Sequence, residues 1–425
     1  MKKLFKILIG LLVLSLALTA CAPAAAEEAP VAEEAPAAEE APAAEEAPAA
    51  EEAPAAEEVA EPKEDILIGN LQDETGGMAV LSTPLTYAAT MKIEEINAAG
   101  GINGRMLKLV TYDTRSDVTE AINAYTRMVE QDKVPVVLGP PISNIGIAVA
   151  PVAEELQVPI VGLFMVEAAF KQESGDPWTY MFLGQNSDKI QGNVMGQYSA
   201  VELGVKKTAI LFNNQNSYST GIAMAYKEKI IENGGEVVIE ETYAWGDQDF
   251  RAQLTKMIAE DPDSIFFPGY PAEIPLIMAQ AYELGFEGLM LGDNSVPPTG
   301  LSPNTDPEVS KRTYYPYALN PTDPELQAWA AEYEAKFEVA PLAQSYSGAD
   351  AFGLIVTAIE ACGDDVTSEC ITKELNKIES YVGYQGTFDM SPEEHAPIGL
   401  PMAIMKIVDG AQVFDMWYLA DGPAE

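Results

Sequence analysis

Short apolar runs alternate with longer amphipathic runs along most of this chain. In one stretch, the apolar run Val134–Gly139 is followed by an apolar-periodic run, Ile145–Leu156, and then by a second apolar run, Val158–Phe164. Buried parallel strands are near-continuous apolar runs, whereas a helix repeats its apolar positions every three to four residues. The order strand, helix, strand predicts one right-handed crossover unit.

The same alternation continues on both sides of this unit. Pro84 stands early in the first predicted helix, and glycine pairs at Gly100-Gly101 and Gly234-Gly235 end two of the helices. Besides 145–156, the predicted helices are 82–98, 117–131, 186–203, 218–232, 248–258, 272–284, 324–337 and 344–361. The other predicted strands are 66–70, 106–112, 208–212, 236–241, 264–267, 289–292, 386–388, 402–408 and 413–417. Such alternation predicts an α/β fold of two doubly wound, Rossmann-like lobes.

A small-molecule site is expected where the helix of the crossover unit begins. In parallel sheets, ligands bind outside the carboxyl ends of the strands, where helix N-termini point. Ser143 lies near the N-cap position there, and the free N–H groups of a helix start suit a carboxylate. We therefore expect a site between Gly139–Asn144 and Gly162–Glu167. A purely structural N-cap without a ligand is the alternative interpretation.

The N-terminal segment predicts export and tethering. Residues 1–20 combine a basic start with an apolar core too short to span a bilayer, and Leu18-Thr19-Ala20-Cys21 looks like a bacterial lipobox. Lipid-modified Cys21 would then be the mature N-terminus, whereas an ordinary signal peptide with a chance cysteine is the alternative. Residues 21–62 contain Cys21 and a Glu-Glu-Ala-Pro repeat, whose prolines and paired glutamates favour a disordered tether.

Charge and length limit the partners of the remaining chain. The 425 residues have a net charge of −42, most of it after Lys63. This negative excess argues against nucleic acid or an anionic membrane face as a partner, so we expect membrane contact only through the lipid anchor. The chain that follows the tether is long enough for two domains.

Residues with catalytic or metal-binding chemistry are few. His395 is the only histidine and lies in a Ser-Pro-Glu-Glu-His stretch that predicts a surface turn. A Ser–His or Cys–His apparatus therefore has at most one base. The sequence contains no histidine cluster with zinc spacing and no glycine-rich phosphate loop. We expect no catalytic residue, no metal and no cofactor.

Two cysteines, Cys362 and Cys370, remain when Cys21 is lipidated. They flank Gly363-Asp364-Asp365, which predicts a turn between two helices. Outside the cytoplasm such a pair favours a disulfide, and two separate buried thiols are the alternative.

A series of short motifs stands in one order along the chain: Ile68-Gly69, Glu94–Gly104 (EEINAAGGING), Asp113, Gly139, Tyr218 with Gly221, and Gly246–Phe250. Together these motifs resemble the leucine/isoleucine/valine-type solute-binding proteins of bacterial ABC importers. The resemblance covers residues 66–417 and implies a type I periplasmic-binding-protein fold, with two lobes joined by a three-crossing hinge and a ligand cleft between them. By this pattern, residues 66–184 and 315–384 form one lobe, and residues 185–314 and 385–425 form the other.

The resemblance also implies which residues contact the ligand. Ser143 matches a serine that holds an amino acid's carboxylate, Tyr218 and Tyr270 match aromatic residues of the cleft, and Leu81 falls where the first loop adds an apolar wall. The expected ligand-binding residues are Leu81, Ser143, Asn144, Phe164, Met165, Val166, Tyr218, Tyr270, Asp293 and Asn294. Ordinary packing is the alternative for each aromatic residue.

Two positions depart from the family's pattern. Val166 stands where the family usually has a threonine, and valine offers no hydroxyl, although backbone groups at Phe164 can still serve. Asn294 stands opposite the family's ammonium-binding acid, with Asp293 one residue earlier. Either a shift of one residue restores the charge, or the ligand has no ammonium group.

The function that the resemblance implies is solute binding outside the cytoplasm. A lipid-anchored monomer would close its lobes on a small polar ligand, an amino acid or a related carboxylate or amide, and deliver it to an ABC permease. A sensory receptor that signals without transport is the second interpretation, and an enzyme on the same fold is the third.

Overall fold

The computed structural model describes residues 63–296 and 310–424. The predictions for the signal peptide, Cys21 and the tether lie outside these residues. Among the described helices, none has the length and apolar character needed to cross a membrane.

The first sheet has five parallel strands in the order β2-β1-β3-β4-β5. They are β1 (Ile66–Gln72), β2 (Leu107–Asp113), β3 (Val137–Leu138), β4 (Ile160–Gly162) and β5 (Met181–Leu183). The helices that connect them are α1 (Ala79–Ala98), α2 (Val118–Glu130), α3 (Ser143–Leu156) and the short α4 (Glu167–Phe170). The strand–helix–strand unit predicted around α3 is present.

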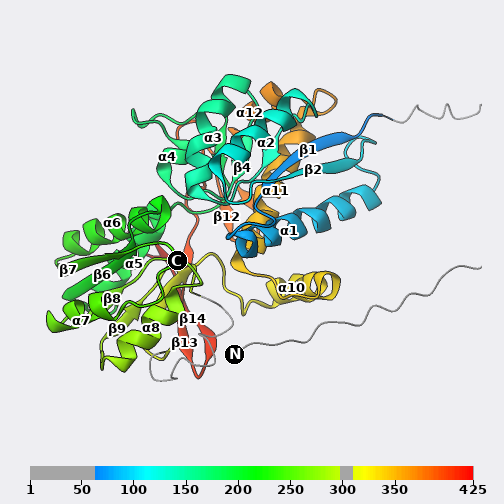
Figure 1. The fold of residues 1–425 in the computed structure, drawn as a ribbon. Helices are drawn as coiled ribbons and strands as arrows, with labels where there is room; N and C mark the ends of the chain where they lie inside the picture. Colours follow the sequence, from blue (N-terminus) through cyan, green and yellow to red (C-terminus); the bar gives the residue numbers. More distant parts are fainter. Residues whose placement is uncertain (1–62, 297–309, 425) are drawn as a thin grey trace, which may run out of the picture. The chain divides into compact units, whose positions relative to one another are not determined.

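Side chains alternate between the two faces of this sheet. Val137 and Ile160 pack in the cluster that contains α2 and α3, whereas Leu138 and Val161 pack in the cluster that contains α1 and α11 (Ala343–Cys362). This period of two is the geometry of a strand, and it explains why the central strands are apolar on both sides. The sheet is therefore covered by helices on both faces (Figure 1).

The second sheet has eight strands in the order β15-β14-β13-β10-β9-β8-β6-β7. Its parallel part contains β6 (Lys207–Asn213), β7 (Glu236–Tyr243), β8 (Ser264–Phe266), β9 (Leu289–Leu291) and β10 (Thr313–Tyr317). Its antiparallel part adds β13 (Met402–Val408), β14 (Ala411–Leu419) and β15 (Gly422–Pro423). The helices of this lobe are α5 (Asp188–Val201), α6 (Ser217–Glu232), α7 (Arg251–Ala259) and α8 (Ile274–Glu283).

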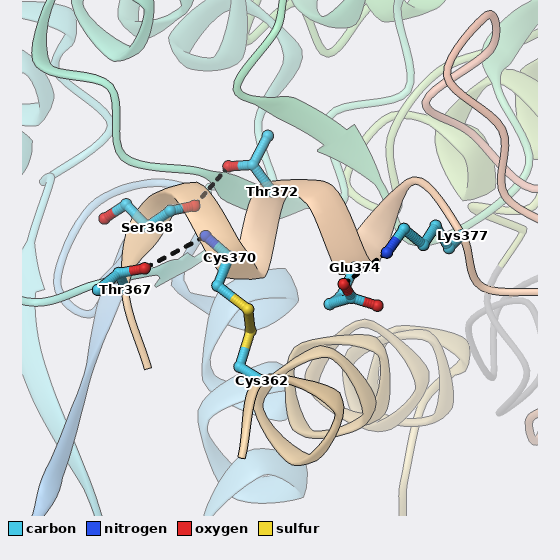
Figure 2. The surroundings of a disulfide bond; sticks show 7 residues. All are labelled: Cys362, Thr367, Ser368, Cys370, Thr372, Glu374 and Lys377. Atoms are coloured by element: carbon cyan, nitrogen blue, oxygen red, sulfur yellow. Dashed lines mark hydrogen bonds and ion pairs between the residues drawn. A yellow bond between two sulfur atoms is a disulfide. The ribbon is translucent and has the colours of Figure 1, made fainter. Parts of the chain in front are cut away.

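Late elements of the chain complete the first lobe. They are α10 (Pro324–Phe337), α11, α12 (Ser368–Leu375) and the hairpin of β11 (Tyr381–Val382) and β12 (Thr387–Phe388). Cys362 at the end of α11 and Cys370 in α12 form a disulfide, with their Cα atoms 5.9 Å apart (Figure 2). Thr367 caps α12, because its hydroxyl accepts a hydrogen bond from the Cys370 N–H at 3.3 Å.

Two features differ from the predictions. Strand β10 continues the second sheet to Tyr317, and Phe388 packs in the core of the first lobe, so the second and third of the three expected chain crossings lie a few residues later than expected. His395 was expected in a surface turn but is 4% exposed. Its ring stacks on Phe182 at 4.2 Å, and burial lowers the pKa of the imidazole. The prediction was wrong because it rested on the polar residues next to His395 in the sequence. The burial of His395 instead depends on its contact with Phe182 of the distant strand β5.

Candidate ligand-binding site

A cavity of about 40 Å³ is lined by residues that follow strands of both sheets. From the first lobe and the adjoining crossing the lining residues are Met78, Leu81, Pro141, Ile142, Ser143, Leu163, Met165, Gln185 and Gln344. From the second lobe they are Tyr218, Tyr270, Asn294 and Ser295. A cavity that binds benzene is about 150 Å³, so a solute of amino-acid size requires side chains or lobes to move.

The turn between β3 and α3 positions the serine of the first lobe. Gly139 has a φ of +89°, and a side chain there would clash with the carbonyl oxygen of Leu71, so the turn requires glycine. Helix α3 begins at Ser143, with Ile142 as its N-cap. The hydroxyl of Ser143 therefore does not cap the helix as expected. It accepts a hydrogen bond from the Met165 N–H at 3.2 Å and so joins the two loops of the site.

The loop after β4 alternates between the cavity and the core. Leu163 and Met165 line the cavity, whereas the Phe164 ring is fully buried in the core, where a Cβ on Gly146 would lie 2.6 Å from the Phe164 Cβ. Val166 is the N-cap of α4 and packs against the same core. The structure thus places Phe164 and Val166 behind the site, because successive residues of an extended segment point in opposite directions.

Tyrosine side chains form the wall of the second lobe. The rings of Tyr218 and Tyr270 are 5.4 Å apart, and Trp245 packs against Tyr270 at 5.0 Å. The Tyr218 hydroxyl donates to Asn294 Oδ1 at 2.7 Å and lies 3.3 Å from Ser295 Oγ. Burial raises the pKa of Tyr218 and Tyr270, so both hydroxyls keep their protons at neutral pH.

Two acids lie behind this wall. Asp293 has no exposed surface, and its carboxylate accepts the N–H groups of Gly269 at 2.9 Å and Ser295 at 2.8 Å. Burial raises the pKa of Asp293 to about 7. Glu273 is 3% exposed, burial raises its pKa, and its Oε2 has no hydrogen-bond partner among the described residues. Within the described part of the chain, the cavity lining itself contains no charged side chain.

The first turns of two helices meet beside the cavity. The side-chain oxygen of Asn144 in α3 accepts a hydrogen bond from the Ser217 N–H in α6 at 3.4 Å. Asn144 therefore bridges the lobes and is not part of the lining. The positive ends of two helix dipoles converge here, and this arrangement favours an anionic group.

Six of the ten residues expected from the sequence line the cavity. They are Leu81, Ser143, Met165, Tyr218, Tyr270 and Asn294. Gln185 was missed, although it follows β5 and the rule of carboxyl strand ends would have found it. Its Nε2 donates to the Leu163 carbonyl at 2.7 Å. Gln344 was also missed, and no local signal marks it, because it arrives on a helix far along the chain.

Metal binding has no support in the described residues, since no three of their His, Cys, Asp or Glu side chains are grouped as ligands for an ion. The lining residues offer hydroxyl, amide and backbone groups that can bind a solute, together with apolar and aromatic walls.

Comparison with known proteins gives consistent matches. The periplasmic binding protein family is matched over residues 65–412. An amino acid binding protein of Pseudomonas aeruginosa is 30% identical over 234 residues, which cover 55% of this chain and 61% of the relative. The leucine-, isoleucine-, valine-, threonine-, and alanine-binding protein of the same species is 29% identical over 222 residues, 52% of this chain and 58% of the relative. The chain thus spans about three fifths of the length of these curated relatives.

Solved structures match over a larger share. The leucine-binding protein LivK from Thermotoga maritima has a TM-score of 0.74 and 27% identity, covering 83% of this chain and 98% of that one. The substrate-binding protein LivJ of a branched-chain amino acid transporter from Streptococcus pneumoniae, solved with isoleucine, has a TM-score of 0.73 and 27% identity. It covers 84% of this chain and 99% of that one.

Proposed function

Because this chain belongs to the type I periplasmic binding proteins of the branched-chain amino acid family, we propose that it carries a small polar solute to an ABC importer. Its homologues are solute-binding proteins of transporters, which bind amino acids outside the cytoplasm. The finer proposal is a lipid-anchored monomer that closes its two lobes on the solute and presents the closed form to a permease.

The observation that carries this proposal is the convergence of two helix starts and a tyrosine wall on one cavity. Ser143 and Tyr218 belong to different lobes, and both line it. A solute that contacts both residues has differential affinity for the closed form, which is the requirement for a ligand-driven closure.

The lining supports a carboxylate or amide ligand that does not depend on an ammonium group. Asn294 lines the cavity, whereas Asp293 lies behind it and is already bound by two backbone N–H groups. A one-residue shift that would bring Asp293 into the cavity must break both of these hydrogen bonds. The Ser143 hydroxyl and the first N–H groups of α3 remain as donors for a carboxylate. The first N–H groups of α6, at Ser217, Tyr218 and Ser219, already donate to the side chains of Asn144 and Asn216.

Native mass spectrometry of the protein purified without added solute tests the proposed function. We expect a complex with one small carboxylate or amide, which dissociates on partial unfolding. A protein that stays free of solute, and that binds no member of a library of amino acids, carboxylates and amides in calorimetry, would contradict the proposal.

The lipid anchor is tested separately. Cys21→Ser should release the protein from membranes or leave its signal peptide attached, because the lipid is added to this cysteine. A variant that still fractionates with membranes at full mature size would exclude lipidation at Cys21. Deletion of residues 24–59 should leave solute affinity unchanged, and a shift in Kd beyond about threefold (about 0.65 kcal/mol) would assign the tether a role in binding.

A sensory receptor is the alternative function, since the same closed form could signal to a kinase or chemoreceptor. Genes for a permease and an ATPase beside the gene of this protein favour transport, and their replacement by a receptor gene favours sensing.

A further inference from the structure

A second cavity, the outer cavity, lies in the first lobe and is lined by residues of α1, α10, α11 and the β11–β12 hairpin. Its volume is about 450 Å³, larger than that of the cleft cavity. Small-molecule sites measure about 300–1,000 Å³. The outer cavity shares no lining residue with the cleft cavity, so the two can be occupied independently.

Aromatic rings form one wall of the outer cavity. Trp329 of α10 packs 5.0 Å from Tyr384 and 4.6 Å from Tyr346, and the last two rings are 5.9 Å apart. Trp329 and Tyr384 are half-buried, so part of each ring faces the cavity. Tyr381 of the hairpin adds a third lining ring, and its hydroxyl occupies the place that a side chain at Gly353 would need.

Carboxylates surround these rings. Glu95 of α1 and Glu325 and Glu332 of α10 are exposed at the mouth of the outer cavity. Asp350 of α11 is buried, and it accepts the N–H groups of Tyr384 at 2.7 Å and of Gln385 at 2.9 Å, which fixes a carboxylate under the hairpin.

One basic side chain also belongs to this lining. Lys92 is paired with Glu95 at 3.0 Å, so four carboxylates face one lysine. The net potential of the outer cavity is therefore negative.

We propose that the outer cavity binds a small organic cation that carries an alkylated ammonium group. The faces of aromatic rings attract cations, and cages of such rings are a recognised means of binding quaternary ammonium. Alkyl groups on the nitrogen suit the apolar part of the lining, and the carboxylates raise the local concentration of cations. A simple metal ion would need a tight group of ligands, and the described residues contain none.

Calorimetry on the full purified protein tests this proposal with choline chloride and its neutral isostere, 3,3-dimethyl-1-butanol. We expect saturable one-to-one binding of choline and no saturable heat with the neutral alcohol. Trp329→Leu should weaken choline binding at least about fivefold, because it removes the largest ring while keeping an apolar side chain. Equal binding of the alcohol would overturn the proposal, since the site would then recognise shape alone.

The double variant Glu325→Gln/Glu332→Gln tests the same cavity independently, in case Trp329→Leu does not fold. Both side chains are exposed, so the variant should fold normally, and it should weaken choline binding by about threefold or more at low salt. Glu120→Gln, which removes an exposed acid on α2, is the matched control and should leave choline binding unchanged. Unchanged binding in the double variant and in Trp329→Leu would contradict the proposal.

Two further outcomes identify other occupants. Loss of choline binding in Ser143→Ala would place choline in the cleft and overturn the proposal, since Ser143 lies in the other cavity. A lysine-rich peptide that binds while choline does not would also overturn it, in favour of a protein partner.

Discussion

The cleft cavity and the outer cavity differ most in charge. The lining of the cleft cavity consists of hydroxyl, amide, apolar and aromatic side chains, whereas four carboxylates and one lysine line the outer cavity. Both cavities have a buried aspartate that backbone N–H groups bind. Asp293 lies behind the wall of the cleft cavity, whereas Asp350 is part of the lining of the outer cavity. The chain has a net charge of −42, but no acidic side chain of the described residues is part of the cleft lining.

We therefore expect the side chains at the cavity surface, together with the helix ends, to decide the charge of the ligand that each cavity binds. A carboxylate in the cleft lining would repel an anionic solute at a cost of several kcal/mol. The positive ends of α3 and α6 would compensate the charge of an anion there without a charged side chain. Changes that move charge into the cleft, or remove a donor from it, therefore test the comparison directly.

Asn294→Asp should have the largest effect. The new carboxylate can still accept the Tyr218 hydroxyl, which lies 2.7 Å from Asn294 Oδ1, so the geometry is kept while a charge enters the cleft. We expect 4-methylpentanoate, an anion without an ammonium group, to bind about 100-fold more weakly in calorimetry. Asn103→Asp, an exposed change elsewhere in the same lobe as Ser143, is the control. Unchanged affinity in Asn294→Asp would show that the ligand does not approach this residue.

Ser143→Ala should weaken the same ligand by about 1–3 kcal/mol, because a charged acceptor loses a hydroxyl donor in a water-excluded cleft. The change also removes the acceptor of the Met165 N–H, so urea unfolding must be measured beside calorimetry to separate affinity from stability. Ser174→Ala, at an exposed serine, is the matched control. An unchanged affinity in Ser143→Ala would show that the Ser143 hydroxyl does not bind the ligand and has only a structural role.

The buried aspartates predict a fall in stability as pH rises. Burial raises the pKa to about 7 for Asp293 and about 6 for Asp350, above the ordinary value of about 4, so the folded state holds these protons more tightly than the unfolded state. The free energy of unfolding should therefore fall between about pH 4 and pH 7, by at most about 1.4 kcal/mol per pH unit and group. Asp188, also buried, contributes to the same fall.

Substitution separates these contributions. Asp293→Asn should flatten the fall up to about pH 7, whereas Asp350→Asn should flatten only the part below about pH 6. Urea unfolding across this range is the measurement. Identical pH profiles in wild type and both variants would show that neither group titrates in this window.

Asn144→Ala should have the smallest effect. It removes a single hydrogen bond to the Ser217 N–H at 3.4 Å, so we expect a loss of about 0.5–1 kcal/mol in affinity, because less of the protein reaches the closed form. Small-angle scattering with and without ligand should show a larger change on binding than in wild type. The same scattering change in both proteins would indicate that this contact does not favour closure.

Much of the fold could be predicted because each strand and helix has a local signal. The apolar run before Gly139 and the periodic run after Ser143 specify β3 and α3 within a few residues. The mixed second sheet could not be predicted in the same way, since the antiparallel pairing of β13 with β10 depends on contacts between residues far apart in the chain.

The site was predicted only in part, because the direction of a side chain also depends on contacts between residues far apart in the chain. Tyr218 and Tyr270 were found because they match aromatic residues of the family's cleft, and both line the cavity. The direction of a side chain is not local information: Phe164 turns into the core, Asp293 is held by backbone groups, and Gln344 arrives on α11. The burial of His395 against Phe182 is a further long-range contact that composition did not reveal.

The central claim is that the cleft binds a carboxylate or amide without needing an ammonium group, and a comparison of leucine with its des-amino analogue tests it most directly. Calorimetry on the wild-type protein should show that 4-methylpentanoate binds at least as tightly as leucine, and Asp293→Asn and Glu273→Gln should leave this order unchanged. Tight binding of leucine, about 100-fold weaker binding of 4-methylpentanoate, and loss of the difference in either variant would contradict the account, because a buried acid would then hold the ammonium group.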